Sequence, residues 1–208
     1  NVKGTQNLLR GLEYAPKLPK SFVFISSVAV YGLGKGLDVC ELHPLNATDA
    51  YGASKIEAER IVAAWCKENG VICTILRLPL LVGPNPPGNL LHMINGIRGN
   101  YYFNIAGGIV KKSMVLAQDV AKFIPVISTI GGTYNLTDGE HPTFLELSKA
   151  IAKSEVPSLP LFVAKIFGLV GDLIGNKAPV NSFKINKIIY DLTFDDSKAR
   201  LVGWKSQS

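Results

Sequence analysis

The amino-acid sequence predicts an α/β protein, with a parallel sheet flanked by helices and a smaller, mostly helical C-terminal part. Residues 21–27 and 71–78 are two continuous apolar runs, which is typical of parallel strands covered on both faces. Residues 51–69 lie between these runs and have the pattern of a helix. A strand–helix–strand order indicates a right-handed crossover between parallel strands. Beyond residue 143 the remaining predicted elements are helices.

The first half of the chain alternates helix, strand and loop. Residues 3–14 predict a helix because Leu8, Leu9 and Leu12 fall on one face. Residues 32–50 are rich in Gly, Pro and Asn and predict a loop. Gly70 predicts the end of the helix at 51–69, since glycine readily adopts the left-handed conformation that follows many helices.

The second half contains shorter elements. Strands are expected at residues 101–103, 112–116 and 132–136. Further helices are expected at residues 89–99, from Asp119, near residues 182–190 and shortly before Gly203. Thr143 and Glu146 have the spacing of a capping box, which predicts a helix that runs to about residue 153.

Composition narrows the class of protein. Of the 208 residues, 47% are hydrophobic and 18% are charged, which is typical of a folded chain. The net charge is +6, but the basic residues are scattered, with Lys111 and Lys112 the densest pair, so nucleic-acid binding is not expected. A modest positive field suits an anionic nucleotide substrate.

The cysteines and histidines favour neither disulfides nor metal binding. Cys40, Cys66 and Cys73 are odd in number and have no Cys-x-x-Cys spacing, which favours a reducing, cytoplasmic setting. The histidines at 43, 92 and 141 are far apart, and no metal site is expected.

Residues 159–174 form an apolar stretch that Lys165 and Asp172 interrupt. The stretch is too short to span a bilayer, so no transmembrane segment is expected. We expect a helix that packs on the protein, with contact to a membrane surface as the alternative.

Tyr51 and Lys55 form the most informative pattern in the chain. A four-residue step places them one turn apart on one face of the predicted helix. A phenol beside a fixed cation loses its proton more easily and can act as a general acid or base. Ser27, at the end of the preceding strand, can hydrogen-bond the same substrate oxygen. The three residues predict proton transfer in alcohol–ketone chemistry, although this spacing also occurs on solvated helix faces.

Six segments match one family in order along the chain. They are residues 1–9, Ser26-Ser27-Val28-Ala29-Val30-Tyr31-Gly32, Tyr51-Gly52-Ala53-Ser54-Lys55, and residues 76–84, 115–121 and 196–204. Together they resemble the extended short-chain dehydrogenases/reductases of the nucleotide-sugar epimerase/dehydratase group. The resemblance implies a partial Rossmann-like domain at residues 1–84 and 113–136, and a substrate-binding lobe at 85–112 and 137–208. It also implies a homodimer formed through residues 3–14 and 51–69.

The resemblance assigns the site residues one by one. Tyr51 would be the general acid/base, Lys55 would also hold the nicotinamide ribose, and Ser27 would orient the substrate oxygen. Ser26 competes with Ser27 for that last role. Tyr51, Lys55 and Pro79 would contact the cofactor, which is NAD or, as the alternative, NADP.

Asn89 and Lys112 are the candidates for the substrate diphosphate. Asn89 resembles an asparagine that touches this group in relatives, although it is equally suited to cap a helix. Lys112 precedes Asp119 by seven residues, where many relatives carry an arginine. Lysine keeps the charge but lacks the bidentate geometry of a guanidinium.

Several departures from the family narrow the activity. Val28 and Ala29 stand where the 4,6-dehydratases carry Asp-Glu, so dehydration is not expected. Leu80 replaces an asparagine of UDP-galactose 4-epimerases, which makes that activity less favoured. No Gly-x-Gly-x-x-Gly or Gly-x-x-Gly-x-x-Gly turn follows a strand. We therefore expect these residues to be the C-terminal two-thirds of a longer enzyme, inactive alone and with poor affinity for NAD.

These features predict an NAD(P)-dependent enzyme that acts at C4 of a UDP-amino-sugar or a related nucleotide sugar. The reaction is either epimerisation or reduction of a 4-keto sugar, in surface polysaccharide biosynthesis. One alternative is a non-enzymatic sensor or binding module with the same fold. Another is a steroid-dehydrogenase-like oxidoreductase, in which a diphosphate contact would serve no purpose.

Overall fold

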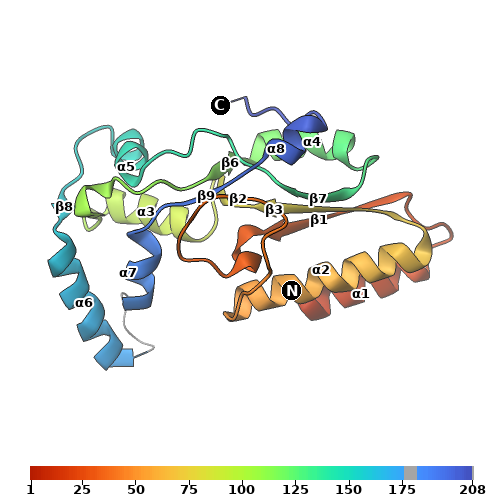
Figure 1. Ribbon diagram of the computed structural model, residues 1–208, viewed down its shortest axis with the longest axis horizontal. Coiled ribbons are helices and arrows are strands. Elements are labelled where there is room, and N and C mark those ends of the chain that lie inside the picture. Colours follow the sequence, from red (N-terminus) through yellow and green to blue (C-terminus); the bar gives the residue numbers. More distant parts are fainter. Residues whose placement is uncertain (176–181, 208) are drawn as a thin grey trace.

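A computed structural model describes residues 1–175 and 182–207 (Figure 1). The first elements are α1 (Val2–Glu13), β1 (Ser21–Ser27), η1 (Val28–Tyr31), β2 (Gly36–Val39), α2 (Ala50–Asn69), β3 (Ile72–Leu78), β4 (Leu80–Val82) and α3 (Asn89–Arg98). The middle elements are β5 (Asn104–Ile105), η2 (Ala106–Gly108), β6 (Met114–Leu116), α4 (Ala117–Ile127) and β7 (Gly132–Asn135). The last are α5 (Phe144–Ala152), β8 (Ser158–Leu159), α6 (Leu161–Ile174), α7 (Ser182–Ile188), β9 (Leu192–Phe194) and α8 (Ser197–Leu201).

A parallel sheet with the strand order β1-β3-β7 forms the centre of the fold. β1 and β3 pair from Ser21 opposite Ile72 to Ser27 opposite Leu78, and β7 pairs with the other side of β3. Helix α2 connects β1 to β3, so the strand–helix–strand prediction and the α/β class are confirmed.

Helices cover the sheet on two sides (Figure 1). α1 and α2 lie side by side along one face, where Leu9, Val62 and Trp65 belong to one buried cluster. α4 and α8 lie on the opposite face, where Phe123 and Trp204 pack against the sheet. The C-terminal segment therefore belongs to the core around the sheet. The proposed division of the chain into two domains stays a prediction.

β1 differs from the expected fully covered strand. Within the described residues it lies at the edge of its sheet, and most of its side chains are only half-buried. Ile25 is exposed, although the strand is apolar from Phe22 to Ile25. The apolar run therefore predicted the strand correctly, but the prediction that the strand is covered on both faces is wrong.

Local capping signals were read correctly. Gly70 ends α2 in the left-handed conformation, with φ of 66°. Thr143 and Glu146 form both hydrogen bonds of a capping box at the start of α5. These features depend on neighbouring residues alone, which is why the sequence is sufficient to predict them.

Two predictions about short strands are wrong. Residues 101–103 are not a strand; the short strand begins at Asn104. Residues 32–50 are not all loop, because they contain β2, which pairs in parallel with β9. The partners lie more than 150 residues apart, as Asp38 and Thr193 illustrate. No pattern local to either segment reports such a pairing.

α6 and α7 pack side by side and project from one end of the molecule (Figure 1). α6 matches the helix expected in residues 159–174, but much of its surface is exposed, contrary to simple packing on the protein. Within residues 1–175 and 182–207, no helix has the length and apolar character needed to cross a membrane.

Candidate functional site

The candidate site lies where the parallel strands end. β1 ends at Ser27, β3 at Leu78 and β7 at Asn135, and the register places these three ends along one edge of the sheet. Ligands of open parallel sheets bind outside this carboxyl edge. Pro79 follows β3 directly and is half-buried there.

Helix α2 begins beside this edge. The carboxylate of Asp49 caps the helix by accepting a hydrogen bond from the backbone N–H of Gly52 at 3.1 Å. Gly52 is required at this point because a Cβ would lie 2.7 Å from the carbonyl oxygen of Ala29. Tyr51 lies between these two positions and is 51% exposed. The close contact therefore fixes the start of the helix, and with it the base of the Tyr51 side chain.

Lys55 is held one turn after Tyr51. Its ammonium donates a hydrogen bond to the carbonyl oxygen of Ile25 at 2.8 Å and lies 4.9 Å from the ring centre of Phe24. Burial lowers the pKa of Lys55, and the carboxylate of Glu59 partly opposes that effect. The cation is thus anchored to β1 two residues before Ser27.

The structure separates the roles of the two serines. Ser26 is buried and its hydroxyl donates to the carboxylate of Glu59 at 2.5 Å. Ser27 is half-buried, and its oxygen accepts the backbone N–H of Ala29 at 3.2 Å, capping η1. Because that contact uses only an acceptor site, the Ser27 hydroxyl keeps its proton for another acceptor. Ser26 lacks that freedom.

A buried polar network lies beneath this edge and was not predicted. Arg77 of β3 makes two hydrogen bonds to the carboxylate of Glu59, at 3.1 and 2.7 Å. It also donates to the hydroxyl of Tyr31 at 3.1 Å, and that hydroxyl donates to Asn135 at 2.8 Å. Burial lowers the pKa of Arg77, but the hydrogen bond to Glu59 raises it, so the pKa of Arg77 is raised overall. The network ties α2, β3, η1 and β7 together and so orients the helix that carries Tyr51.

The sequence did contain a signal for this network. Arg77 is a lone charge inside an apolar strand, and a buried charge needs a partner. Glu59 follows Lys55 by four residues, as Lys55 follows Tyr51, so all three share a helix face.

A cavity of about 340 Å³ adjoins the start of α2. Its lining residues are Gly32, Gly34, Lys35, Thr48, Asp49, Asn186 and Tyr190. The ammonium of Lys35 lies 5.8 Å from the ring centre of Tyr190. Asp49 lies two residues before Tyr51, so this cavity is next to the candidate acid/base.

Lys112 contacts Tyr190, one of the residues that line this cavity. Its ammonium donates to the carbonyl oxygen of Tyr190 at 2.8 Å. Burial lowers the pKa of Lys112 to about 8, with the carboxylate of Asp191 opposing the shift. Asn89 lies outside the cavity and is exposed as the first residue of α3. The capping alternative for Asn89 fails, because Gly88 holds the N-cap position.

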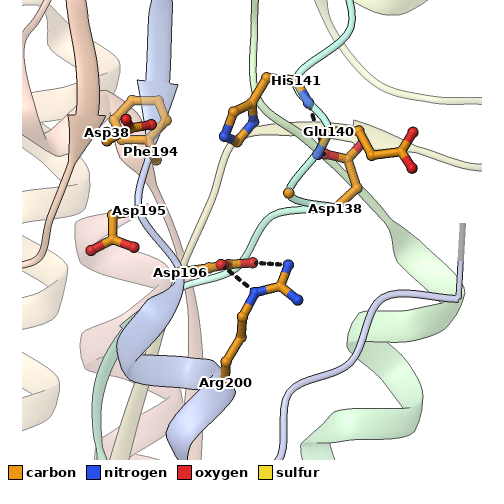
Figure 2. Close-up of a pocket in the computed structure, with 9 residues that line it drawn as sticks. Asp38, Asp138, Glu140, His141, Phe194, Asp195, Asp196 and Arg200 are labelled. Carbon is orange, nitrogen blue, oxygen red and sulfur yellow. Dashed lines mark hydrogen bonds and ion pairs between the residues drawn. The ribbon is translucent and has the colours of Figure 1, made fainter.

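A second cavity, of about 410 Å³, is strongly acidic (Figure 2). Its lining residues are Asp38, Asp138, Gly139, Glu140, His141, Phe194, Asp195, Asp196 and Arg200. Such a concentration of carboxylates repels an anionic ligand, so an anion would fit the cavity that contains Lys35 better.

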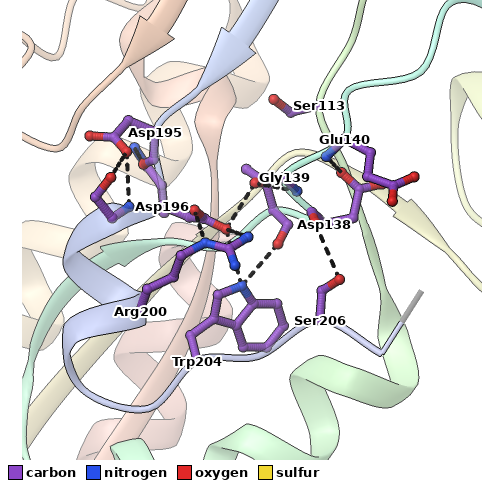
Figure 3. Close-up of polar contacts among 12 residues, drawn as sticks. Ser113, Asp138, Gly139, Glu140, Asp195, Asp196, Arg200, Trp204 and Ser206 are labelled. Carbon is purple, nitrogen blue, oxygen red and sulfur yellow. Dashed lines mark hydrogen bonds and ion pairs between the residues drawn. The ribbon is translucent and has the colours of Figure 1, made fainter.

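Several of these carboxylates serve the fold (Figure 3). Asp196 accepts hydrogen bonds from Arg200 at 2.7 and 3.0 Å, and from the indole N–H of Trp204 at 3.2 Å. Asp195 accepts the backbone N–H of Ser197 at 2.9 Å. These contacts stabilise the C-terminal turn, and the indole N–H of Trp204 also donates to the carbonyl oxygen of Thr137, just beyond β7, at 2.9 Å. Among the described residues, no group of His, Cys, Asp and Glu side chains has the arrangement of a metal site.

Within the described chain, the structure brings only some of the predicted residues into contact. Lys55 touches β1 near Ser27, but the hydroxyl of Tyr51 has no hydrogen-bond partner among the described residues. Lys112 donates a hydrogen bond to Tyr190, which lines the cavity, whereas Asn89 is not among the lining residues. Lys35 was not predicted. The roles assigned to all of these residues stay predictions.

Solved structures of similar fold cover the whole chain. UDP-glucuronic acid 4-epimerase from Bacillus cereus, in complex with UDP-glucuronic acid and NAD, has a TM-score of 0.71 at 19% identity, covering 100% of this chain and 62% of that one. RMD from Pseudomonas aeruginosa, complexed with NADPH, also has a TM-score of 0.71 at 19% identity, covering 100% and 68%. Both similarities confirm the fold.

Curated relatives extend the comparison to sequence. N-acetyl-alpha-D-glucosaminyl-diphospho-ditrans,octacis-undecaprenol 4-epimerase of Escherichia coli O157:H7 is 27% identical over 219 residues, covering 98% of this chain and 65% of that protein. UDP-glucose 4-epimerase of Erwinia amylovora is 31% identical over 182 residues, covering 74% and 53%. The chain thus spans about half to two-thirds of the length of these relatives. The model of the NAD dependent epimerase/dehydratase family matches residues 1–135, and the chain belongs to this family.

Proposed function

We propose that the protein is an NAD(P)-dependent epimerase or 4-keto reductase that acts at C4 of a UDP-(amino)sugar or related sugar diphosphate, in surface polysaccharide biosynthesis. One observation carries the proposal: the ammonium of Lys55 lies 2.8 Å from the carbonyl oxygen of Ile25, one turn after Tyr51, at the carboxyl edge of the sheet. This contact holds a cation on the helix face that Tyr51 shares, beside the strand ends. The exposed phenol of Tyr51 is open to a substrate.

Each residue has a distinct task in this proposal. Tyr51 takes a proton from the C4 hydroxyl, or returns one to the keto oxygen. Ser27 donates a hydrogen bond to that oxygen and keeps it in reach of Tyr51. Lys55, whose ammonium contacts β1, and Pro79, directly after the neighbouring strand β3, would hold the nicotinamide end of NAD or NADP. The nicotinamide, when bound, supplies hydride exchange with C4.

The diphosphate is the feature shared by the relatives' printed substrates. The Escherichia coli relative is named for a sugar on diphospho-undecaprenol, and the Erwinia relative for UDP-glucose. Lys35 and Lys112, both in contact with Tyr190, offer positive charge for such a group. Asn89 would add an amide contact. Val28 and Ala29 in η1 provide no acid or base, which disfavours dehydration.

We also infer a cytoplasmic homodimer formed through α1 and α2. Leu8 supports this inference, because α1 leaves it 55% exposed. No described part of the chain covers this exposed side of α1.

Turnover by the full-length protein tests the proposal. Nucleotide sugars and their 4-keto forms are supplied with NAD, NADH or NADPH, and products are separated chromatographically. Tyr51→Phe should lower kcat by about 10²- to 10⁴-fold, because it removes a general acid/base. Tyr14→Phe, at an exposed tyrosine just beyond the end of α1, is the matched control and should keep full activity. Full activity of Tyr51→Phe would refute the acid/base assignment. Binding without turnover by the unaltered protein would favour the sensor alternative.

A further inference from the structure

The cavity at the start of α2 carries charges of both signs. Lys35 and Asp49 are the charged residues among those that line it. Neither of them takes part in an ion pair within residues 1–175 and 182–207. Both charges are therefore open to interaction with a molecule that enters the cavity.

The positive charge gathers around Tyr190. The ammonium of Lys35 lies 5.8 Å from the ring centre of this tyrosine. The ammonium of Lys112 lies 2.8 Å from its backbone carbonyl oxygen. Two cations around one residue favour the most negative part of a ligand, which in a sugar diphosphate is the diphosphate.

The negative charge lies beside the candidate acid/base. One carboxylate oxygen of the half-buried Asp49 accepts the backbone N–H of Gly52 at 3.1 Å. Within the described residues, the side chain of Asp49 makes no other hydrogen bond. A carboxylate has about four acceptor positions, so Asp49 can also accept hydroxyl or amine protons from a ligand. Tyr51 follows two residues later, which places these acceptors close to where the sugar would react.

The nature of the sugar follows from these two sets of charges. With the diphosphate beside Lys35 and the reacting carbon beside Tyr51, the sugar would lie next to Asp49. Hydroxyl and amine groups of the sugar can donate to this carboxylate, whereas a carboxylate on the sugar would meet a like charge. We propose that the cavity selects a sugar without a carboxylate group and that Asp49 is the residue that rejects uronic acids. The inference rests on the proposed function, which supplies the diphosphate and the reacting carbon.

Two nucleotide sugars form a matched pair for testing this selection. UDP-glucose and UDP-glucuronic acid differ only at C6, where a hydroxymethyl group is replaced by a carboxylate. Isothermal titration calorimetry of each with the full-length protein, at constant ionic strength, gives the two Kd values. The unaltered protein should bind UDP-glucose at least about tenfold more tightly, because like charges roughly 6–8 Å apart near a protein surface repel to at least that extent.

Asp49→Asn isolates the contribution of the carboxylate. Asparagine caps a helix about as well as aspartate, so α2 should still begin at the same residue. The ratio of the Kd for UDP-glucuronic acid to the Kd for UDP-glucose should fall about tenfold. Glu57→Gln is the matched control, because it removes one negative charge from an exposed position of the same helix. Its ratio should equal that of the unaltered protein.

Lys35→Met tests the orientation of the ligand. Both nucleotide sugars carry the same diphosphate, so loss of this cation should weaken both by similar factors and leave the ratio unchanged. Unchanged affinity for both ligands would place the diphosphate away from Lys35 and overturn the inference. A ratio altered by this variant would overturn it as well, because Lys35 would then contact the sugar.

Three further results would overturn the selection by Asp49. They are equal affinity of the unaltered protein for both ligands, equal ratios for Asp49→Asn and Glu57→Gln, and no binding of either ligand.

Turnover assays separate this inference from the proposed function. Selective binding of UDP-glucose without turnover of any nucleotide sugar refutes the proposed function and leaves the selection standing. Turnover of both sugars with equal kcat/KM has the opposite outcome, since it supports the proposed function and overturns the selection.

Discussion

Lys112 gives the sharpest test of the proposed diphosphate site. Its half-buried ammonium donates to the carbonyl oxygen of Tyr190, and burial lowers the pKa of Lys112 to about 8. A diphosphate beside this ammonium would favour its charged form and restore the proton. Affinity for a nucleoside diphosphate should therefore fall as Lys112 loses its charge above about pH 8.

The size of the effect follows from the two protonation states. With a pKa of about 8, about nine-tenths of Lys112 is charged near pH 7 and about one-tenth near pH 9. If only the charged form binds well, the Kd of the unaltered protein rises about tenfold over that range. Lys112→Arg keeps a permanent charge, so its Kd should stay nearly constant. Lys112→Met should bind weakly at both values.

Isothermal titration calorimetry of UDP with the three full-length proteins provides the measurement. The uracil ring and the buffer titrate alike in every sample, so the comparison of Lys112 with its arginine variant cancels their contribution. Equal pH dependence for these two proteins would show that Lys112 does not meet the diphosphate.

Three further predictions concern stability and helix position. Arg77→Met leaves the buried carboxylate of Glu59 without its cation and with only the hydroxyl of Ser26 as a donor, so urea unfolding should show a loss of about 3–5 kcal/mol. Glu57→Gln, in an exposed pair, should change stability little. Gly52→Ala places a Cβ 2.5 Å from the methyl group of Ala47, which should displace the start of α2. We expect a loss of stability of about 1–3 kcal/mol and a lower turnover. Gly4→Ala, with open space around the added methyl group, should change neither stability nor turnover. Burial keeps the folded-state pKa of Lys112 at about 8 instead of 10.5, so between these values the unfolded chain binds the extra proton and this lysine makes the unfolding free energy rise with pH. The buried thiol of Cys66, with its pKa raised to about 12, acts in the opposite direction in both proteins, so the measurement is the difference in unfolding free energy between the unaltered protein and Lys112→Met. A difference that stays constant over that window would contradict this account.

Local sequence signals predicted the frame of the fold well. The end of α2 at Gly70 and the capping box at Thr143 depend on adjacent residues, and both are confirmed. The order of β1, α2 and β3 followed from apolar runs separated by a helical pattern. Burial was harder to predict, because the half-exposed β1 and the outward side of α6 have apolar sequences without a cover in the described chain.

Features that depend on distant residues were missed. The hydrogen bond between Tyr31 and Asn135 joins positions 104 apart in the chain. The Lys35 cavity needs Asn186 and Tyr190 for its far wall. A single sequence shows which residues are chemically capable, such as Tyr51, but the fold decides which others surround them.

Because β2 pairs with β9, the cavity can form only after most of the chain has been synthesised. The backbone N–H of Gly36 bonds to the carbonyl oxygen of Asp191 at 2.9 Å, which sets Lys35 opposite Tyr190. During synthesis, the ribosome releases the segment around Lys35 long before it makes the segment around Tyr190. Nascent chains therefore cannot form the complete cavity, and a chain that ends ahead of residue 190 lacks one of its walls.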